Sequence, residues 1–251
     1  MDIIKRNFFR IIRNAVFSSD EPVEPMSQYK WDILANIAKT HGVDAYVSKA
    51  LGKECQPTMR MPDAGMSRMY NGFLNRRLQK LREDEPLSAE PSIETLNLLD
   101  IIVQTTETML TNGLQFSNII QIGMYLRKDG DKVDFIKLEV WLRRLRLTKM
   151  AQLEGDILIQ TLGFDTDEIP FASQALLASS YKLAIGSLDN PICLHVEDLQ
   201  NHQSSSIFVE GNPKAMYKTM RNSMKYFFYA PIEVTSCMLN GLKMSMASTE
   251  E

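Results

Sequence analysis

The apolar residues of this chain recur with a helical period from one end to the other, and this pattern limits the available folds most strongly. Apolar side chains spaced three and four residues apart lie on one face of a helix. No alternating apolar and polar run is long enough for the strands of a sheet. The sequence therefore predicts an all-α fold, a single multi-helix domain of about ten helices. At most one short strand or hairpin is expected, near residues 191–210.

Proline, glycine and capping residues divide this pattern into separate helices. Ser27, Asp63, Ser92 and Asp134 are expected to cap the helices that follow them. The expected helices occupy residues 3–16, 28–41, 43–51, 64–81, 93–111, 116–126, 135–145, 147–162, 171–185, 213–229 and 231 onward. We divide the chain into an N-terminal helical region (1–82), a connector (83–95), a central helical region (96–187), an irregular loop (188–212) and C-terminal helices (213–251). Together they are expected to form one compact domain.

Composition and charge predict an ordinary cytoplasmic protein. The net charge of −3 gives no global attraction to nucleic acid. Cys55, Cys193 and Cys237 are odd in number and far apart, which favours a reducing compartment over a disulfide framework. The first residues mix charges into apolar ones, unlike a signal peptide. No run approaches the roughly 18 apolar residues of a membrane span. We therefore expect no nucleic-acid partner and no membrane span.

Two short acidic motifs and one Cys/His segment could carry metal chemistry. Asp129–Asp131 and Asp165–Asp167 are D-x-D motifs, a spacing that can hold a divalent cation between carboxylates. Both lie in polar connections between helices, where aspartate is common because it caps and turns the chain. Cys193, His195 and His202 match no strong zinc pattern. We predict no catalytic, cofactor-binding or metal-binding residue from these motifs, and no cofactor.

Basic residues gather in three places, one of which is Arg76, Arg77, Lys80 and Arg82. The other two are retained as weak candidates for a binding surface. The first cluster is Arg143, Arg144, Arg146 and Lys149. The second is a stripe at i, i+4, i+7 and i+11 on the helix expected after Pro213: Lys214, Lys218, Arg221 and Lys225. Opposite this stripe lie Met216, Met220, Met224 and Phe227. Such a helix can meet an anionic partner or a membrane surface, but a solvated face over a core-facing stripe is the commoner arrangement.

Three segments resemble the bacterial uncharacterised nucleotidyltransferase family. "YKWDILANIAKTHGVDAYVSKAL" (29–51) is similar to the opening of that family, where an aromatic helix precedes an A-x-x-H-G-V segment. Residues 111–171, from "TNGLQFSNII" to "FDTDEIPF", resemble its helical C-terminal half. "FFYAPIEVTSCMLNGL" (227–242) looks like its closing helix. The resemblance implies helical N- and C-terminal regions around a catalytic core.

The catalytic core of that family has no counterpart in this chain. Active members carry a mixed sheet with a G-S/G turn for phosphates and a D-x-D strand for magnesium. The resemblance implies that this block would sit between Arg82 and Leu96, but "EDEPLSAEPSIET" (83–95) has no glycine and no strand pattern. The positions resembling the family's helical Arg and Asp are Ser117 and Gln121, so both charges are absent. The connector therefore resembles a junction across a missing core.

We interpret the chain as a non-catalytic helical relative of nucleotidyltransferases, a pseudoenzyme that acts as a binding or interaction scaffold. One alternative is a divergent magnesium-dependent nucleotidyltransferase that uses Asp129 and Asp131, or Asp165 and Asp167. It would require those carboxylates to converge in one cleft with a basic residue. Another is a partner subunit for an active nucleotidyltransferase encoded separately. The partner is unknown from sequence, and both a protein partner and a homo-oligomer stay open. An exposed apolar patch would favour an interaction role.

Overall fold

The computed structural model describes residues 2–50, 67–173, 177–189 and 213–247. Within these ranges the side chains of residues 50, 177–178, 213–216, 218 and 244–247 are not described. The described residues form eleven α-helices and no strand, which confirms the all-α prediction. The short strand expected near residues 191–210 lies outside the described residues. None of the described helices is both long and apolar enough to cross a membrane.

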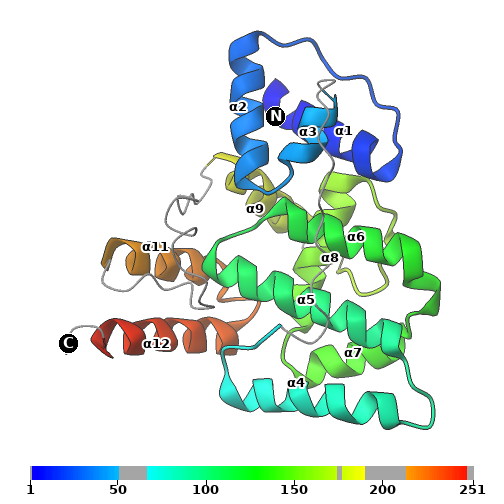
Figure 1. The fold of residues 1–251 in the computed structure, drawn as a ribbon, viewed down its shortest axis with the longest axis vertical. Coiled ribbons are helices and arrows are strands. Elements are labelled where there is room, and N and C mark those ends of the chain that lie inside the picture. Colours follow the sequence, from blue (N-terminus) through cyan, green and yellow to red (C-terminus); the bar gives the residue numbers. More distant parts are fainter. Residues whose placement is uncertain (1, 51–66, 174–176, 190–212, 248–251) are drawn as a thin grey trace. The chain divides into compact units, whose positions relative to one another are not determined.

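Figure 1 shows the described helices in their order along the chain. Their bounds are α1 (Ile3–Phe17), α2 (Gln28–Thr40), α3 (Asp44–Ala50), α4 (Gly72–Asp84), α5 (Ile93–Thr111), α6 (Phe116–Asp129), α7 (Phe135–Arg144), α8 (Thr148–Leu162), α9 (Leu177–Asp189), α11 (Pro213–Ser223) and α12 (Pro231–Ala247). Short 3-10 turns are η1 (Glu85–Leu87), η2 (Gly130–Lys132), η3 (Thr166–Glu168) and η5 (Met224–Tyr226).

The chain divides into two compact units, each assembled from three segments. The first unit comprises Met1–Asp63, Leu114–Lys132 and Gln152–Pro191, and the second comprises Ala64–Gly113, Val133–Ala151 and Ile192–Glu251. α1, α2, α3, α6 and α9 thus belong to the first unit, and α4, α5, α7, α11 and α12 to the second. The linear division into regions expected from the sequence stays a prediction.

An aromatic cluster holds the core of the first unit. Phe8 and Phe9 of α1 meet Phe116 of α6 edge to face, with ring centroids 5.5 and 5.2 Å apart. His41, the C-cap of α2, packs against the same Phe116 ring at 5.1 Å. All four side chains are buried. Because α1 turns its apolar face to this cluster, its polar face is left for other contacts.

α5 is the central helix of the second unit. Its apolar residues do not form a narrow stripe, and side chains around most of its circumference are buried. It packs against α7, α11 and η1. A helix that is apolar nearly all round belongs inside a fold, because each face then needs a partner. The neighbouring α11 is fastened to it by Asn222, whose Nδ2 donates to the carbonyl of Met109 at 3.0 Å.

Several predicted helix boundaries are wrong, and three of them have an identifiable cause. Residues 67–71 are not helical, and α4 begins at Gly72 because the Asn71 side chain caps it, accepting from the N–H groups of Phe73 and Leu74. Residues 171–173 are also not helical, since the Ser173 N–H donates to Asp156. α11 ends at Ser223 and gives way to η5 instead of continuing to residue 229. The expected cap Asp63 lies outside the described residues.

The connector 83–95 is an ordered link between α4 and α5. Glu85 is buried, and its Oε1 accepts from the Ser92 N–H at 2.7 Å and from Lys137 Nζ at 2.5 Å. Lys137 also donates to the carbonyl of Glu90 at 2.9 Å. One lysine of α7 therefore fixes both ends of the link. The predicted capping position Ser92 is the N-cap residue, although its hydroxyl pairs with Thr95 instead of a backbone N–H.

Candidate functional site

The first basic cluster lies at the corner between α7 and α8. Arg143 and Arg144 are in the last turn of α7, Arg146 occupies the turn with a left-handed φ of 58°, and Lys149 is in the first turn of α8. All four side chains are exposed. Arg143 pairs with Glu139 one turn earlier on α7 at 2.6 Å, which offsets part of the positive charge. Among the described residues, the cluster is therefore a solvated corner.

The D-x-D motifs have local structural roles, in an ion pair at one turn and in the cap of another. Asp129 pairs with Lys132 at 2.7 Å, and a hydrogen bond from this lysine lowers the pKa of Asp129. The Asp165 side chain accepts from the Glu168 N–H, while the Glu168 carboxylate accepts from the Asp165 N–H, which makes a capping box around η3. Asp131 and Asp167 are exposed.

No metal-binding geometry arises from these residues. Among the residues that the structure describes, no three His, Cys, Asp or Glu side chains gather as a cation site would require. The convergence that a divergent magnesium enzyme needs is therefore not seen between the two D-x-D turns. Cys193, His195 and His202 lie outside the described ranges.

The second basic stripe lies on the hairpin formed by α11 and α12. The two helices run antiparallel and side by side, joined through η5 (Figure 1). Arg221 and Lys225 are exposed, as predicted for a stripe that faces solvent. The side chains of Lys214 and Lys218 lie outside the described part of the chain.

Large apolar side chains are exposed on the same hairpin, and we call them the hairpin surface. They are Tyr217, Met224, Phe227, Phe228, Ile232, Leu239 and Leu242. Phe228 is 83% exposed, Tyr217 66% and Leu239 65%. On α12, Ile232, Leu239 and Leu242 stand at i, i+7 and i+10 and share one helix face. A concentration of this kind is typical of a surface that meets another molecule.

The expectation that Met224 and Phe227 face the core is wrong. Both are exposed, because α11 stops at Ser223 and the chain then leaves the helical period. The side chains that turn inward at this end are instead Asn222, Ser223 and Tyr226. The sequence signal for this change is the run "KYFFYAP", in which four aromatic residues and one alanine precede Pro231.

A small cavity lies between the two helices of the hairpin. Its volume is about 10 Å³, which is room for about one water molecule. Thr219, Met220 and Ser223 line it from α11, and Cys237, Met238, Gly241 and Leu242 line it from α12. Met220, Met238 and Leu242 are partly exposed, so flexible apolar side chains border the cavity. Such side chains can adjust to an apolar group from outside.

A row of polar side chains on α12 anchors the hairpin to the segment before α4. Glu233 accepts from the N–H groups of Tyr70 and Asn71, at 2.7 and 3.2 Å. Ser236 Oγ accepts from Asn71 Nδ2 at 3.1 Å, and Asn240 Nδ2 donates to the Tyr70 carbonyl at 3.2 Å. These three positions, i, i+3 and i+7, share one face of α12. The row holds the hairpin in place by polar contacts.

Burial makes the groups around this anchor poor acids. Burial raises the pKa of Glu233, and the nearby Glu107 carboxylate raises it further. Burial also raises the pKa of the Cys237 thiol to about 12 and that of the Tyr70 phenol above its usual value. The Cys237 thiol is therefore not the reactive thiolate that nucleophilic catalysis needs.

No family model, no curated protein and no solved structure matches this chain. The resemblance to nucleotidyltransferases therefore stays a hypothesis from the sequence.

Proposed function

We propose that this chain is a non-catalytic interaction scaffold, a degenerate relative of nucleotidyltransferases, which binds an acidic amphipathic helix of a protein partner on the hairpin surface. The observation that carries this proposal is the gathering of exposed aromatic and aliphatic side chains on α11, η5 and α12. Covering a side chain such as Phe228 or Leu239 would stabilise a complex by about 1.5–3 kcal/mol each before the costs of association.

Charge favours an acidic partner over a second copy of the chain. The exposed charged side chains described on the hairpin are Arg221, Lys225 and Lys243, all positive. The acidic residue described there, Glu233, is buried in the anchor. Two such hairpins facing each other would bring like charges together, which costs free energy. A helix with glutamates beside its apolar face would complement both the charges and the apolar groups.

The missing core and the D-x-D turns support a scaffold over an enzyme. The connector 83–95 is a short link fixed by Lys137. The carboxylates of the two D-x-D motifs pair with Lys132, cap a turn or face solvent. A partner subunit of a separate nucleotidyltransferase is one form of the proposed scaffold, since it needs the same kind of surface.

The test uses a synthetic amphipathic helix of about 20 residues, long enough to be helical, with leucine on one face and glutamate on the other. We expect the full chain to bind it by fluorescence anisotropy, and the F228S/L239S double variant to bind at least about tenfold more weakly. The I136S variant is the matched control, because Ile136 is 80% exposed on α7 of the same unit.

Three results would contradict the proposal. Equal weakening by I136S would show that the apolar contact is unspecific. Equal binding of a lysine-bearing version of the helix would remove the charge argument. Binding to vesicles of anionic lipid, with no binding of the acidic helix, would replace the protein partner by a membrane surface.

A further inference from the structure

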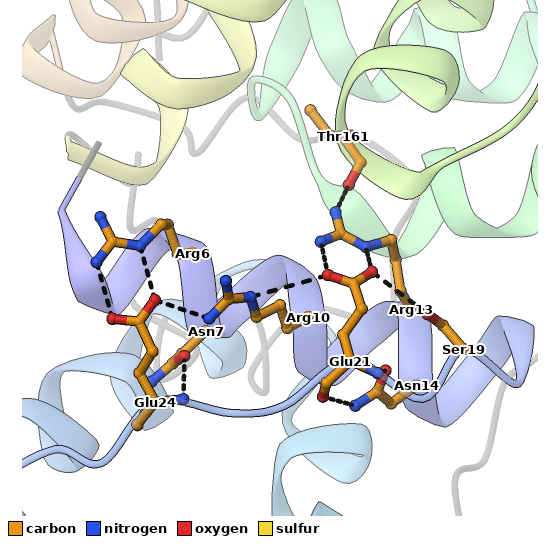
Figure 2. A network of polar contacts seen from close by, with 9 residues as sticks. All are labelled: Arg6, Asn7, Arg10, Arg13, Asn14, Ser19, Glu21, Glu24 and Thr161. Carbon is orange, nitrogen blue, oxygen red and sulfur yellow. Dashed lines mark hydrogen bonds and ion pairs between the residues drawn. The ribbon is translucent and has the colours of Figure 1, made fainter.

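The polar face of α1 repeats one dipeptide at a spacing of seven residues. Arg6-Asn7 and Arg13-Asn14 stand two helical turns apart, with Arg10 between them. We call these five residues the clamp. The segment 18–27, the strap, leaves α1 through Ser18, whose left-handed φ of 56° reverses the chain direction. The strap contains Glu21 and Glu24, each followed by proline. Figure 2 shows the polar contacts between the clamp and the strap.

Each asparagine of the clamp holds the backbone of one glutamate. Asn7 Nδ2 donates to the Glu24 carbonyl at 2.8 Å, and the Glu24 N–H donates to Asn7 Oδ1 at 3.0 Å. Asn14 makes the same pair with Glu21, at 2.8 and 3.0 Å. Each amide thus donates to and accepts from the backbone of one residue, as a neighbouring β-strand would. Asn7 is fully buried, so its orientation is fixed by packing.

Each arginine next to such an asparagine holds the carboxylate of the same glutamate. Arg6 donates to both Glu24 oxygens, at 3.0 and 2.8 Å, and Arg13 donates to both Glu21 oxygens, at 2.5 and 2.6 Å. Arg10 donates to Glu24 at 2.7 Å and lies 3.8 Å from Glu21. Two parallel N–H···O bonds select a carboxylate by shape as well as charge.

The spacing of the clamp matches the spacing of the strap. Seven residues of helix advance about 10.5 Å. Three residues of extended proline-containing chain advance about 9.3 Å. Arg13-Asn14 therefore holds Glu21 while Arg6-Asn7 holds Glu24, with the strap antiparallel to α1. A peptide with its glutamates two or four residues apart would not meet both pairs.

The strap is held by these polar contacts and by little apolar burial. Pro22, Val23 and Pro25 are all exposed, and Glu21 and Glu24 are partly exposed. Apolar burial is what usually makes a docked segment permanent. Exposed ion pairs contribute little net stability each. The clamp thus contacts only an extended backbone with two carboxylates. A peptide segment of another protein can provide the same groups.

We propose that the clamp is a recognition site for an extended acidic peptide of a partner protein with the pattern E-x-x-E, and that the strap occupies this site in cis until a partner replaces it. The site uses residues other than those of the hairpin surface. A second copy is the poorer occupant, because its strap brings the same contacts as the tethered one. The tethered strap also has an effective concentration in the millimolar range.

The test measures binding of a labelled peptide with the sequence of residues 18–28, SSDEPVEPMSQ, to the full chain. In the E21Q/E24Q variant the tethered strap keeps its backbone contacts but loses its charges. We expect this variant to bind the peptide at least about tenfold more tightly than the unaltered chain, because the competing segment is weakened. Fluorescence anisotropy up to millimolar protein provides the measurement.

Two controls separate recognition from charge attraction. A peptide with one alanine inserted between the glutamates keeps its charge, and we expect it to bind at least about tenfold more weakly because it loses the register. Adding N14A to the E21Q/E24Q variant keeps every arginine, and we expect a similar loss through the backbone contacts. Asn14 is only partly buried, so this change does not disturb the core.

The proposal is overturned if E21Q/E24Q binds no more tightly than the unaltered chain, or if the inserted peptide binds as well as the native one. Sedimentation at the same protein concentrations tests the source of the occupant. A dimer that disappears in E21Q/E24Q would show strap exchange between copies, which would overturn the assignment to a partner protein.

Discussion

The clamp on α1 and the hairpin surface of α11 and α12 are both candidate binding surfaces, but the clamp is polar and charged, whereas the hairpin surface is largely apolar. The clamp holds its strap through asparagine and arginine, and the contacts leave Pro22, Val23 and Pro25 of the strap exposed. The hairpin exposes phenylalanine, leucine and tyrosine, while Glu233 on another face of α12 anchors it by polar contacts. One surface is satisfied within the chain, and the other has no described cover.

This difference separates specificity from affinity. Paired hydrogen bonds at fixed spacing reject a segment of the wrong register, but each contributes only about 0.5–1.5 kcal/mol. Apolar side chains contribute more per residue, yet they accept many partners. A scaffold that carried both surfaces could recognise one partner by the spacing of its carboxylates and bind another through buried apolar area. The predictions below test whether each surface depends on the chemistry assigned to it.

The largest effect is expected at the anchor that supports the hairpin surface. Removing the Glu233 carboxylate in E233A leaves two N–H donors, of Tyr70 and Asn71, without their acceptor. Both donors are partly buried, and each one left without an acceptor costs about 1–3 kcal/mol, so we expect the free energy of unfolding to fall by about 3–4 kcal/mol. Urea denaturation provides the measurement. E233Q keeps one acceptor oxygen, and a loss as large as that of E233A would show that charge, not hydrogen bonding, forms the anchor.

The next effect concerns His41, which packs under the clamp helix against Phe8 and Phe116. Neither ring nitrogen makes a hydrogen bond of ordinary geometry to the described residues. Burial lowers the pKa of His41 from 6.5 to about 4, and the backbone of Ser187 and Leu114 offsets only part of this effect. The neutral ring is therefore the form that fits the fold.

A lowered histidine pKa makes the folded state weaker in acid. Above pH 6.5 both folded and unfolded states carry the neutral ring, so the stability is full there. Between pH 6.5 and about 4 the unfolded state binds the proton first, and the free energy of unfolding falls by about 2–3 kcal/mol. H41L should lose this part of the pH dependence in urea denaturation. An unchanged pH profile in H41L would show that other groups cause it.

Much of the fold follows from the sequence because it depends on local signals. The helical period and the caps at Ser27 and Asp134 predict helices that the structure contains. The start of α4 could not be predicted, because Glu233, far away in the chain, binds the preceding backbone. The end of α11 depends likewise on the burial of Asn222 and Tyr226. Local pattern does not show such long-range contacts.

The candidate surfaces could be predicted only partly from the sequence. The exposure of Arg221 and Lys225 agrees with the predicted solvent-facing stripe, but the exposed aromatic residues beside them were expected in the core. The clamp was missed, although its signal is present as "RN" repeated after seven residues and "EP" repeated after three. Each repeat alone is unremarkable in sequence. Their meaning comes from the match between two helical turns and three extended residues.

Within the clamp, the two asparagines should differ in their effect on stability. Asn7 is fully buried and Asn14 is partly buried, although both make the same two hydrogen bonds. We expect N7A to lower the free energy of unfolding by about 2 kcal/mol and N14A by about 1 kcal/mol. N36A is the matched control, because Asn36 is exposed on α2. Equal losses for N7A and N14A would show that burial does not decide the contribution.

A smaller effect is expected from acid on the strap. The hydrogen bond with Arg6 lowers the pKa of Glu24 from 4.5 to about 2, and Arg13 lowers the pKa of Glu21 in the same way. Carboxylates with lowered pKa stabilise docking fully above pH 4.5, and this contribution is lost as the pH falls from 4.5 to about 2. The side-chain amide NMR signals of Asn7 and Asn14 should shift together in that range. E21Q/E24Q should remove the shift, whereas a shift retained in this variant would assign it to another group.

The smallest expected change in stability is at the most exposed aromatic residue of the hairpin surface. Phe228 is 83% exposed, so F228S removes little packing, and we expect the free energy of unfolding to change by less than about 0.5 kcal/mol. Binding of an acidic amphipathic helix should weaken in the same variant, because the lost contact area belongs to the complex and not to the fold. N7A should show the reverse, with a loss of stability and no effect on that helix. If F228S destabilises the chain by more than 1 kcal/mol, Phe228 is packed in solution, and the hairpin would then be a self-contained element instead of an open surface.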